Sequence, residues 1–377
     1  MTSDRDVERF TGLPGMSLME AMQRIDAGSR GIIFIVDSDS RLMGSLTDGD
    51  VRRYILRTGG LLGSAADAMF RDVKALGESE TAGAEQLMKE KEINSIPVVD
   101  DERRILRILF RERKLKDTRR ELKGLPDAPV IIMAGGKGTR LYPYTKILPK
   151  PLIPIGDVPI IERIMDRFYM GGFDDFYITV NYRKEMIKAY FADQKLPYRI
   201  HFVEEDVPLG TAGSIRLIED EFTTPVFVTN CDILIDVDLA LLLEHHMTSG
   251  NAITVVSSLQ NVQIPYGVLQ AREQGIIVGM EEKPSLSYLI NTGMYIVDPA
   301  QFAHIPDGRM FHMTDLMLQT MRAGGRVGMY PIGENAYLDM GQFEEMRRME
   351  ERINEESALE TGINNEQVGY GPIPDIL

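Results

Sequence analysis

The stretch that most constrains the fold is Pro129–Pro151, in which a short apolar run ends abruptly in a glycine-rich segment. Residues 130–133 read as a buried strand, and residues 135–140, GGKGTR, follow directly. Glycine has no Cβ and tolerates positive φ, so backbone N–H groups in such a segment can approach a phosphate closely. Arg140 and Lys150 bring positive charge to the same place. The stretch therefore predicts a phosphate site at the end of a strand.

Two common phosphate-binding templates do not fit this loop. A P-loop places four residues between its first glycine and a Gly-Lys-Ser/Thr sequence, whereas here Lys137 precedes Gly138 and Thr139. The dinucleotide fingerprint needs a third glycine at the position of Leu141. Prolines at positions 143, 149, 151 and 154 also disfavour a helix that starts on the loop. Both templates are excluded.

Composition limits the remaining classes. A chain of 377 residues with 44% hydrophobic and 26% charged residues can form two or three soluble domains. The net charge of −15 argues against nucleic acid or an anionic membrane as a partner. The single cysteine, Cys231, excludes an intramolecular disulfide and a zinc cluster. No signal-peptide pattern or apolar run of about 18 residues is seen, so we expect a cytoplasmic protein without a membrane span.

The first third of the chain contains an internal repeat with an offset of 63 residues. The sequence Ile-Val-Asp at 35–37 is echoed by Val-Val-Asp at 98–100. Each copy reads as helix, strand, acidic turn and strand, with helices expected at 18–27 and 82–92 and strands at 32–36, 42–46, 95–99 and 105–109. We expect a module over 1–122 (copies at about 10–62 and 63–120), a linker at 123–129, a second domain at 130–355 and a tail at 356–377.

The first copy ends in Gly44-Ser45-Leu46-Thr47-Asp48-Gly49-Asp50, which resembles the signature of the CBS domain. In that family two copies pair into one module, and its clefts often bind adenosyl nucleotides. The resemblance implies that the Thr47 hydroxyl contacts phosphate and that Asp50 holds the ribose hydroxyls. Alternatively, Thr47 and Asp50 form the N-cap and first-turn acid of a helix, and the module serves to dimerise the protein. Both interpretations stay open, and we expect a homo-oligomer.

The second copy departs from this signature. Arg107, Phe110 and Arg113 stand at the positions of Gly44, Thr47 and Asp50. Phenylalanine cannot donate to a phosphate and arginine cannot accept from a ribose hydroxyl. A second nucleotide site of the usual form is therefore not expected.

The segment Gly135–Leu141, GGKGTRL, followed by Pro149-Lys150-Pro151-Leu152, resembles the sugar-1-phosphate nucleotidyltransferases, also called NDP-sugar pyrophosphorylases. Their hallmark is GGxGTRL followed by a PKP element, and the resemblance continues over roughly 130–349. It implies an α/β fold: a Rossmann-like, mixed-sheet (GT-A-like) transferase domain preceded by a small α/β CBS-pair domain. It also implies the transfer of a nucleoside monophosphate from an NTP to a sugar 1-phosphate. The residues that it places on the nucleotide are Ala134, Gly135, Gly136, Gly138 and Thr139, with Arg140 and Lys150 on its phosphates.

A second loop, Pro208–Ser214, resembles the base-contacting loop of this family, through Pro208, Gly210 and Thr211. The alternative is a plain helix entry in which the glycines allow close packing. Glu205 falls where thymidylyl- and uridylyltransferases carry a glutamine that reads the base edge. A carboxylate accepts from the N1–H and N2–H₂ groups of guanine and would oppose the O4 acceptor of uracil or thymine. GTP is therefore favoured, with UTP or dTTP as the alternative.

The metal and sugar elements follow the same resemblance. Asp232 follows an apolar run at 226–230 and resembles the first metal-binding acid of the family, although Cys231 replaces the glycine that usually precedes it. Asp339 resembles the second metal-binding acid, although the Trp and Pro that usually flank it are missing. Two carboxylates suit Mg²⁺ as the cofactor. The resemblance places Gly267, Glu282, Asn291 or Thr292 on the sugar and Lys283 on its phosphate.

A CBS pair before a transferase also resembles bacterial enzymes that activate amino sugars, some as GDP derivatives, for nonulosonic acid and surface-glycan synthesis. We therefore expect an amino or N-acetylamino hexose 1-phosphate as the acceptor. The rival class is a non-catalytic regulatory protein that senses a nucleotide.

Overall fold

The computed structural model describes residues 2–4, 7–28, 30–91, 93–111, 119–218, 221–341, 345–347 and 349–351. The structure divides into two compact units. Unit 1 holds Met1–Lys114, Thr254–Thr292 and Gly328–Tyr337, and unit 2 holds Leu115–Ile253, Gly293–Val327 and Leu338–Leu377. Both combine helices with mixed sheets, which confirms the predicted α/β class. The predicted domain limits stay predictions, and Arg113 and the tail at 356–377 lie outside the described residues.

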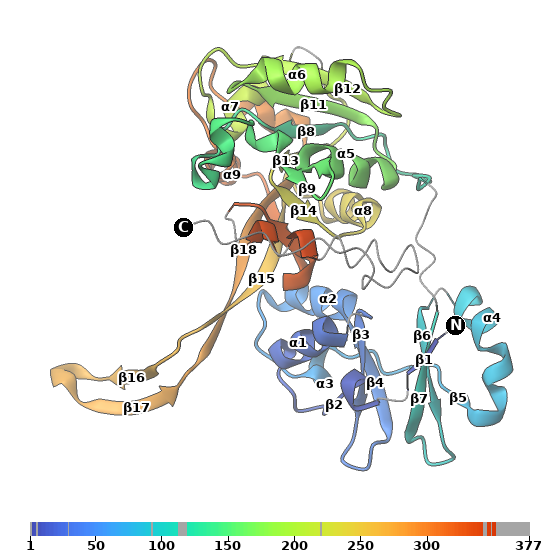
Figure 1. The fold of residues 1–377 in the computed structure, drawn as a ribbon. Helices are drawn as coiled ribbons and strands as arrows, with labels where there is room; N and C mark the ends of the chain where they lie inside the picture. Colours follow the sequence, from blue (N-terminus) through green and yellow to red (C-terminus); the bar gives the residue numbers. More distant parts are fainter. Residues whose placement is uncertain are drawn as a thin grey trace. The chain divides into compact units, whose positions relative to one another are not determined.

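A seven-stranded sheet has the strand order β12-β11-β8-β13-β18-β15-β19. In unit 2, β8 pairs in parallel with β11 and β13, β11 pairs in parallel with β12, and β13 pairs antiparallel with β18 (Figure 1). The strands are β8 (Val130–Met133), β11 (Asp175–Val180), β12 (Arg199–Glu204), β13 (Val226–Asn230), β15 (Ile253–Gln263), β18 (Ser285–Val297) and β19 (Val327–Ile332). The chain passes between the units within β15, β18 and β19.

Amphipathic helices supply much of the unit 2 core. In α5 (Ile160–Met170), residues 160, 161, 164, 165 and 168 are buried, which is the spacing of one helical face. Phe168 packs edge-on against Phe173, Phe176 and Phe227, with ring centroids 5.3–6.4 Å apart. The other helices of unit 2 are α6 (Lys184–Ala192), α7 (Gly210–Gly213), α8 (Leu239–Ser249) and α9 (Met313–Arg322). Short strand pairs join β9 (Pro154–Ile155) to β10 (Val158–Pro159) and β14 (Ile233–Ile235) to β20 (Tyr337–Asp339).

Parallel pairing brings the carboxyl ends of β8, β11, β12 and β13 to one edge of the sheet. The glycine loop follows β8, Asn181 follows β11, Glu205 follows β12, and Asp232 lies just beyond β13. Open α/β sheets place ligand sites at such edges. The fold therefore gathers in unit 2 several residues that the sequence singles out.

The repeat in unit 1 is visible in the strand register. In the first copy β3 (Ile32–Val36) pairs with β4 (Leu42–Thr47), and Ile32 faces Thr47. In the second copy β6 (Ser95–Val99) pairs with β7 (Ile105–Phe110), and Ser95 faces Phe110. Each hairpin has a register shift at the corresponding position, between Ile35 and Val36 and between Val98 and Val99. The register of the hairpins thus confirms the 63-residue offset.

The acidic turns of the two copies are also alike. The Asp37 carboxylate accepts from the amides of Asp39 and Arg41, at 2.9 and 2.8 Å. The Asp100 carboxylate accepts from the amides of Glu102 and Arg104 at the same two distances. An Asx-type turn of this kind reverses the chain tightly. The two hairpins are linked by an antiparallel bridge between Arg41 and Arg104.

The two copies share one apolar core. Its buried members come from both hairpins and from Phe10: Phe34, Val36, Leu42, Ile105, Ile108 and Phe110. The remaining elements of the repeat are β1 (Thr2–Asp4), β2 (Thr11–Gly12), α1 (Leu18–Gly28), α2 (Asp48–Thr58), α3 (Ala65–Ala68), β5 (Leu76–Gly77) and α4 (Ala84–Glu90). The shared core accounts for the pairing of the copies.

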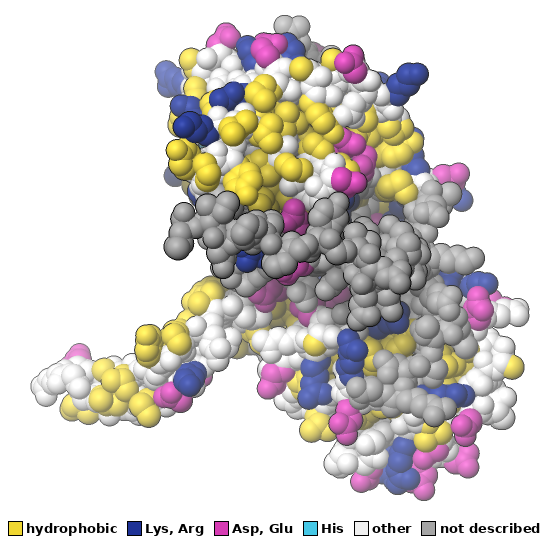
Figure 2. All heavy atoms as spheres, viewed as in Figure 1, with side chains coloured by type: hydrophobic (Ala, Val, Ile, Leu, Met, Phe, Trp, Pro, Cys, Tyr) yellow, Lys and Arg dark blue, Asp and Glu magenta, His cyan; other side chains and the backbone are white. Residues whose placement is uncertain are grey.

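Unit 1 also contains the hairpin of β16 (Gly267–Ala271) and β17 (Ile277–Glu282), visible in Figure 1. Figure 2 shows basic side chains interspersed with acidic ones on the visible surface of each unit. Within the described ranges, no helix combines the length and the apolar character that a membrane crossing requires.

Candidate active site

The glycine loop begins at the buried end of β8 and becomes exposed within three residues. Ala134 is buried, whereas Gly136, Thr139 and Arg140 are exposed. The α-helix that the prolines disfavour does not form: short 3₁₀ turns follow instead, at Thr139–Leu141, Tyr144–Lys146 and Lys150–Leu152. Gly138 has a φ of 63°, and a Cβ there would lie 2.9 Å from the Thr145 side chain, so this position requires glycine. The loop therefore presents its backbone and Arg140 to the surroundings.

Gly135 lies against the carboxylate of Glu205, which is 5% exposed. A Cβ at Gly135 would stand 2.6 Å from Glu205 Oε1. Glu205 Oε2 accepts from the Leu209 amide at 3.2 Å, and Asn181 Nδ2 donates to the Glu205 carbonyl at 2.7 Å. Glu205 thus joins the glycine loop to the Pro208–Ser214 loop, a contact between segments about 70 residues apart in the sequence.

Gly135→Ala is expected to destabilise the protein by about 1–3 kcal/mol, because the new methyl group overpacks the Glu205 carboxylate. Gly136→Ala is the matched control, since nothing lies within 4 Å of a Cβ built there. Urea unfolding of both variants and the parent measures the difference. Equal midpoints for Gly135→Ala and Gly136→Ala would show that the contact with Glu205 is not tight.

The Pro208–Ser214 loop packs against the segment 309–313. A Cβ at Gly210, whose φ is 81°, would lie 2.7 Å from the Phe311 carbonyl oxygen, and one at Gly213 would lie 2.9 Å from that of Arg309. The Thr211 hydroxyl accepts from the Met313 amide at 3.0 Å, at the start of α9. These contacts correspond to the close-packing interpretation of the glycines. Contacts of Pro208, Gly210 and Thr211 with a base stay a prediction.

Lys150 and Asp232 form an ion pair, and their side chains are 17% and 16% exposed. Asp339 lies near them, and its Oδ1 accepts from the Gly341 amide at 2.7 Å. Burial and the charge of Asp232 raise the pKa of Asp339, while the Gly341 amide, Lys150 and Arg140 act in the opposite direction. The Met340 amide also donates to the Asp232 carbonyl at 2.8 Å. The structure thus brings together the two predicted metal acids and the two predicted phosphate cations of unit 2.

The donor set here fits a hard cation. Burial and, after it, the charge of Asp232 raise the pKa of Asp339, and Lys150 already places positive charge beside Asp232. Burial raises the pKa of the Cys231 thiol to about 12, so a neutral thiol stands beside Asp232. Within the described ranges, no group of three or more His, Cys, Asp or Glu side chains is arranged to hold a metal. A cation on Asp232 and Asp339 would therefore take further ligands from water and substrate phosphates, as Mg²⁺ commonly does.

The predicted sugar-side residues lie in unit 1. Gly267 faces Glu282 across the β16–β17 hairpin, and the Lys283 amide donates to the Tyr266 carbonyl at 3.3 Å. Asn291 is exposed on β18, whereas Thr292 is 2% exposed and donates to the Val256 carbonyl at 2.8 Å. That bond gives Thr292 a structural role. The contacts of Gly267, Glu282, Lys283 and Asn291 with a sugar phosphate stay predictions.

Thr47 and Asp50 form a capping box at the start of α2. The Asp50 amide donates to Thr47 Oγ1 at 3.2 Å, and Asp50 Oδ2 accepts from the Thr47 amide at 2.9 Å. Asp50 Oδ1 pairs with Arg53 at 2.5 Å. The helix-cap alternative is therefore present in the structure. Nucleotide binding by these two residues stays a prediction, and it requires a ligand to replace some of these bonds.

Two residues near the site were missed by the sequence reasoning. Asn181 directly follows β11, and its side chain donates to the Glu205 carbonyl. Asn230 ends β13 and lies so close to Gly293, which has a φ of 90°, that a Cβ there would stand 2.3 Å from Asn230 Nδ2. Each of these asparagines stands at the end of an apolar run, as Asp232 does, so the same sequence pattern predicts both.

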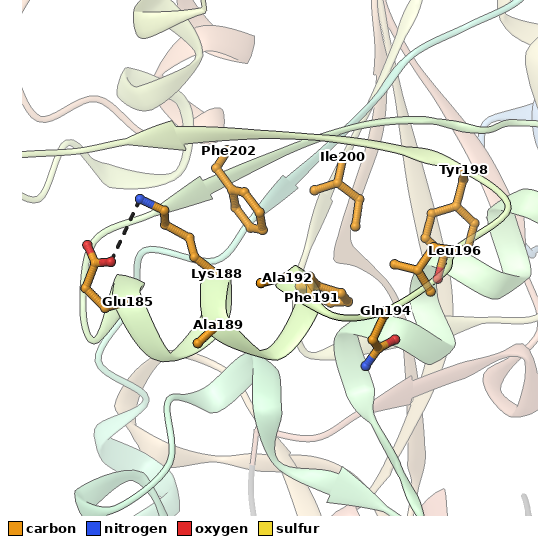
Figure 3. Close-up of a pocket in the computed structure, with 10 residues that line it drawn as sticks. All are labelled: Glu185, Lys188, Ala189, Phe191, Ala192, Gln194, Leu196, Tyr198, Ile200 and Phe202. Atoms are coloured by element: carbon orange, nitrogen blue, oxygen red, sulfur yellow. Dashed lines mark ion pairs between the residues drawn. The ribbon is translucent and has the colours of Figure 1, made fainter.

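A separate pocket of about 550 Å³ lies between α6 and β12 (Figure 3). It is lined by apolar side chains that include Phe191, Tyr198, Ile200 and Phe202, and a 3.9 Å ion pair joins Lys188 to Glu185 at one end. None of the predicted site residues is among the described residues that line it. The pocket is therefore distinct from the candidate site.

Comparison with known proteins defines the class. Residues 129–356, more than half of the chain, match the family model of the nucleotidyl transferases. The chain therefore belongs to the nucleotidyl transferase family. Residues 11–57 match the CBS domain, so the first repeat copy is a CBS domain.

Three relatives illustrate the range of the similarity. The UTP–glucose-1-phosphate uridylyltransferase of Synechocystis is 34% identical over 48% of this chain and 52% of its own. The mannose-1-phosphate guanyltransferase of Debaryomyces hansenii is 35% identical over 45% of this chain and 49% of its own. The D-glycero-alpha-D-manno-heptose 1-phosphate guanylyltransferase of Campylobacter jejuni is 34% identical over 44% of this chain and 74% of its own. The chain spans about half the length of the first two.

Among solved structures, HddC from Yersinia pseudotuberculosis aligns over 60% of this chain and 99% of its own, at 23% identity. The TM-score of 0.47 is too low for this likeness to support a functional assignment.

Proposed function

We propose that this protein transfers a nucleoside monophosphate from an NTP to a sugar 1-phosphate and releases pyrophosphate. The observation that carries the proposal is the grouping of Lys150, Asp232 and Asp339, with Arg140, in the unit that holds the GGKGTRL loop. Family membership and relatives that are named for sugar 1-phosphates support it. A pyrophosphate-release assay on the full chain is the direct test.

The reaction needs positioning and charge neutralisation more than covalent help from the protein. An oxygen of the sugar phosphate attacks the α-phosphorus of the NTP, a new P–O bond forms, and the bond to the β-phosphate oxygen breaks with its electron pair on pyrophosphate. A phosphate monoester is already ionised near neutral pH, so no general base is required. The protein has to hold two polyanions together and stabilise the charge that builds up.

The cations of the site suit these tasks. Arg140 is exposed and, within the described part of the chain, makes no hydrogen bond or ion pair, so it can bind the β- and γ-phosphates at no cost to the fold. Lys150 is paired with Asp232 and can exchange this carboxylate for the α-phosphate. Lys283 is proposed to hold the sugar phosphate. Asp232 and Asp339 would hold Mg²⁺, which supplies charge stabilisation to the phosphates when it is bound.

GTP is the proposed donor, with UTP or dTTP as the alternative. Guanylyltransferases predominate among the relatives described, and a uridylyltransferase is also present. Glu205 is the residue proposed to read guanine, either directly or by placing the loop that contacts the base.

Glu205→Gln is expected to lower the preference for GTP over UTP by about tenfold or more, because a carboxylate acceptor facing guanine is replaced by an amide. Competition between GTP and UTP in the transfer assay measures this ratio. Glu204→Gln is the neighbouring control, since Glu204 is bound to Lys184 and Lys188 at 2.6 and 2.7 Å. An unchanged ratio for Glu205→Gln would contradict base selection by Glu205.

The same variant tests the electrostatics of Glu205. Burial raises the pKa of Glu205, against the opposing hydrogen bonds from the Leu209 amide and from hydroxyls such as that of Ser214. The folded state therefore binds this proton more tightly than the unfolded state. Stability gained from Glu205 should increase as the pH falls from above the folded pKa towards the unfolded value of about 4.5. The unfolding free energy of the parent should therefore rise relative to that of Glu205→Gln as the pH falls through this range, which chemical unfolding at several pH values measures.

An amino or N-acetylamino hexose 1-phosphate is the proposed acceptor, for surface-glycan synthesis. We also propose that the protein is cytoplasmic and homo-oligomeric, and that an adenosyl nucleotide binds at Thr47 and Asp50. The rival function is a non-catalytic sensor of nucleotides. The retention of Arg140, Lys150, Asp232 and Asp339 favours the enzyme, because a sensor does not need all four.

A further inference from the structure

Within unit 1, helix α2 of the CBS domain is joined to strand β19 by one arginine. Arg52 Nε donates to the Pro331 carbonyl at 2.8 Å, and its Nη1 donates to the Tyr330 hydroxyl at 2.7 Å. The guanidinium also lies 4.3 Å from the centroid of the Tyr330 ring. Arg52 is half-buried, and a planar guanidinium satisfies this combination of acceptors and ring face better than an ammonium does. The contact links positions 278 residues apart.

Apolar packing surrounds this contact. Leu259 of β15 belongs to the same buried cluster as Val51 and Ile55 of α2, and Leu289 and Met329 pack against that cluster. A cavity of about 10 Å³ lies between these elements, which is near the minimum for one water molecule. The strands from the transferase part of the sequence therefore complete the core of the CBS domain.

The first residue of α2 takes part in the same contact. Asp48 lies near Gly333: a Cβ built at Gly333 would stand 3.9 Å from Asp48 Oδ1 and 3.3 Å from Asp26 Oδ1. Asp48 Oδ1 is buried and has no hydrogen-bond partner among the described residues. Burial raises the pKa of Asp48, and Arg52 acts against this rise. The N-terminal turns of α2 thus lie against residues 330–333.

The segment that Arg52 contacts leads directly to Asp339, the second predicted metal ligand. From Pro331 it passes through a 3₁₀ turn at Glu334–Ala336 into β20, which ends at Asp339. Asn261 Nδ2 donates to Glu334 Oε2 at 3.1 Å and supports this turn from β15. Asp339 lies eight positions after Pro331, so a change in the position of β19 is transmitted over a short segment.

We propose that Arg52 is a positioning residue for the segment that carries Asp339, so that the CBS domain acts on the transferase through α2 and β19. The catalytic part of this inference rests on the proposed function; the positioning part does not. Thr47, the cap of the same helix, is the residue proposed to bind a nucleotide. A ligand that replaces the Thr47–Asp50 bonds would disturb α2 one turn before Arg52. The effect on the transferase then follows contacts between folded elements and does not require the linker at 123–129.

The test compares Arg52→Ala, Arg52→Lys and Tyr330→Phe with the parent, all as full chains. Hydrogen–deuterium exchange is followed in peptides that cover 327–341, and kcat and KM are measured for the transfer reaction. Arg57→Ala is the matched control, because Arg57 lies on the same helix and its contacts are with Tyr54 and Asp67.

Arg52→Ala is expected to increase exchange in 327–341 about tenfold and to lower kcat about tenfold, with KM for the NTP within about twofold of the parent. A tenfold change corresponds to about 1.4 kcal/mol, which is close to the loss of one hydrogen bond from a charged donor. Arg52→Lys should restore part of both effects. Tyr330→Phe should produce a smaller increase in exchange, and Arg57→Ala should behave as the parent.

Parent-like exchange in 327–341 for Arg52→Ala would overturn the proposal. If Arg52→Ala also loses protection across 18–58, the domain has unfolded and Tyr330→Phe decides: parent-like exchange in that variant overturns the proposal. Increased exchange with unchanged kcat would overturn the link to catalysis. If the parent releases no pyrophosphate, the proposed function fails, while the exchange data still decide whether Arg52 positions the segment.

Discussion

Asp232→Asn is expected to lower kcat by about a thousandfold. Asp232 lies where the carboxyl ends of β8 and β13 meet; it is paired with Lys150, and we propose that it also binds Mg²⁺. Asparagine keeps the shape of the side chain but removes the charge, so metal affinity and the placement of Lys150 are both lost. Removal of a single preorganised electrostatic group typically costs a factor of 10²–10³, and the loss of a metal ligand adds to this.

The control for this variant is Asp236→Asn, four residues further along. Asp236 is exposed, with a 3.8 Å ion pair to Arg167, and should leave kcat within about twofold of the parent. Thermal unfolding distinguishes a catalytic loss from a folding defect, since removal of a partner of Lys150 is expected to cost about 1–3 kcal/mol of stability. A folded Asp232→Asn variant with parental kcat would contradict the assignment of Asp232.

Arg140→Ala is expected to lower kcat/KM for the NTP by about 10²–10³, with no loss of stability. The guanidinium is exposed and, in the described part of the chain, has no hydrogen bond or ion pair to lose. Its proposed partners are the phosphates of the NTP, where the charge of the leaving pyrophosphate develops. Initial rates over a range of NTP concentrations, together with the midpoint of thermal unfolding, measure both quantities.

Lys146→Ala is the matched control, because this exposed cation lies six residues further along, in the next 3₁₀ turn. An effect of similar size in Lys146→Ala and Arg140→Ala would indicate general attraction of the anionic substrate. A specific phosphate contact predicts that kcat/KM for the NTP falls in Arg140→Ala and stays near the parental value in Lys146→Ala.

Local features of the site could be predicted from the sequence. The strand at 130–133, the glycine loop and the acid that follows the strand at 226–230 are each encoded within a few residues, by apolar runs that end in glycine or a polar residue. The hairpin repeat could also be predicted, because equal spacing of Ile32–Thr47 and Ser95–Phe110 produces equal register.

The contacts between distant segments could not be predicted. The approach of Gly135 to Glu205 depends on the parallel order of β12, β11 and β8, which periodicity does not specify. The use of Thr211 as an acceptor for the start of α9 depends on a residue 102 positions away. Nor does the sequence pattern indicate that residues 254–292 and 328–337 form one compact unit with the CBS domain. That grouping arises from apolar side chains such as Leu259 that pack on α2.

The most direct test of the proposed function is pyrophosphate release by the full chain with Mg²⁺, across GTP, UTP, dTTP and ATP and a panel of sugar 1-phosphates. We predict that GTP with an amino or N-acetylamino hexose 1-phosphate yields one pyrophosphate per nucleotide sugar, and that Asp232→Asn lowers the rate of this release by about a thousandfold. Binding of an NTP without pyrophosphate release for any acceptor in the panel would contradict the enzyme and support the nucleotide sensor.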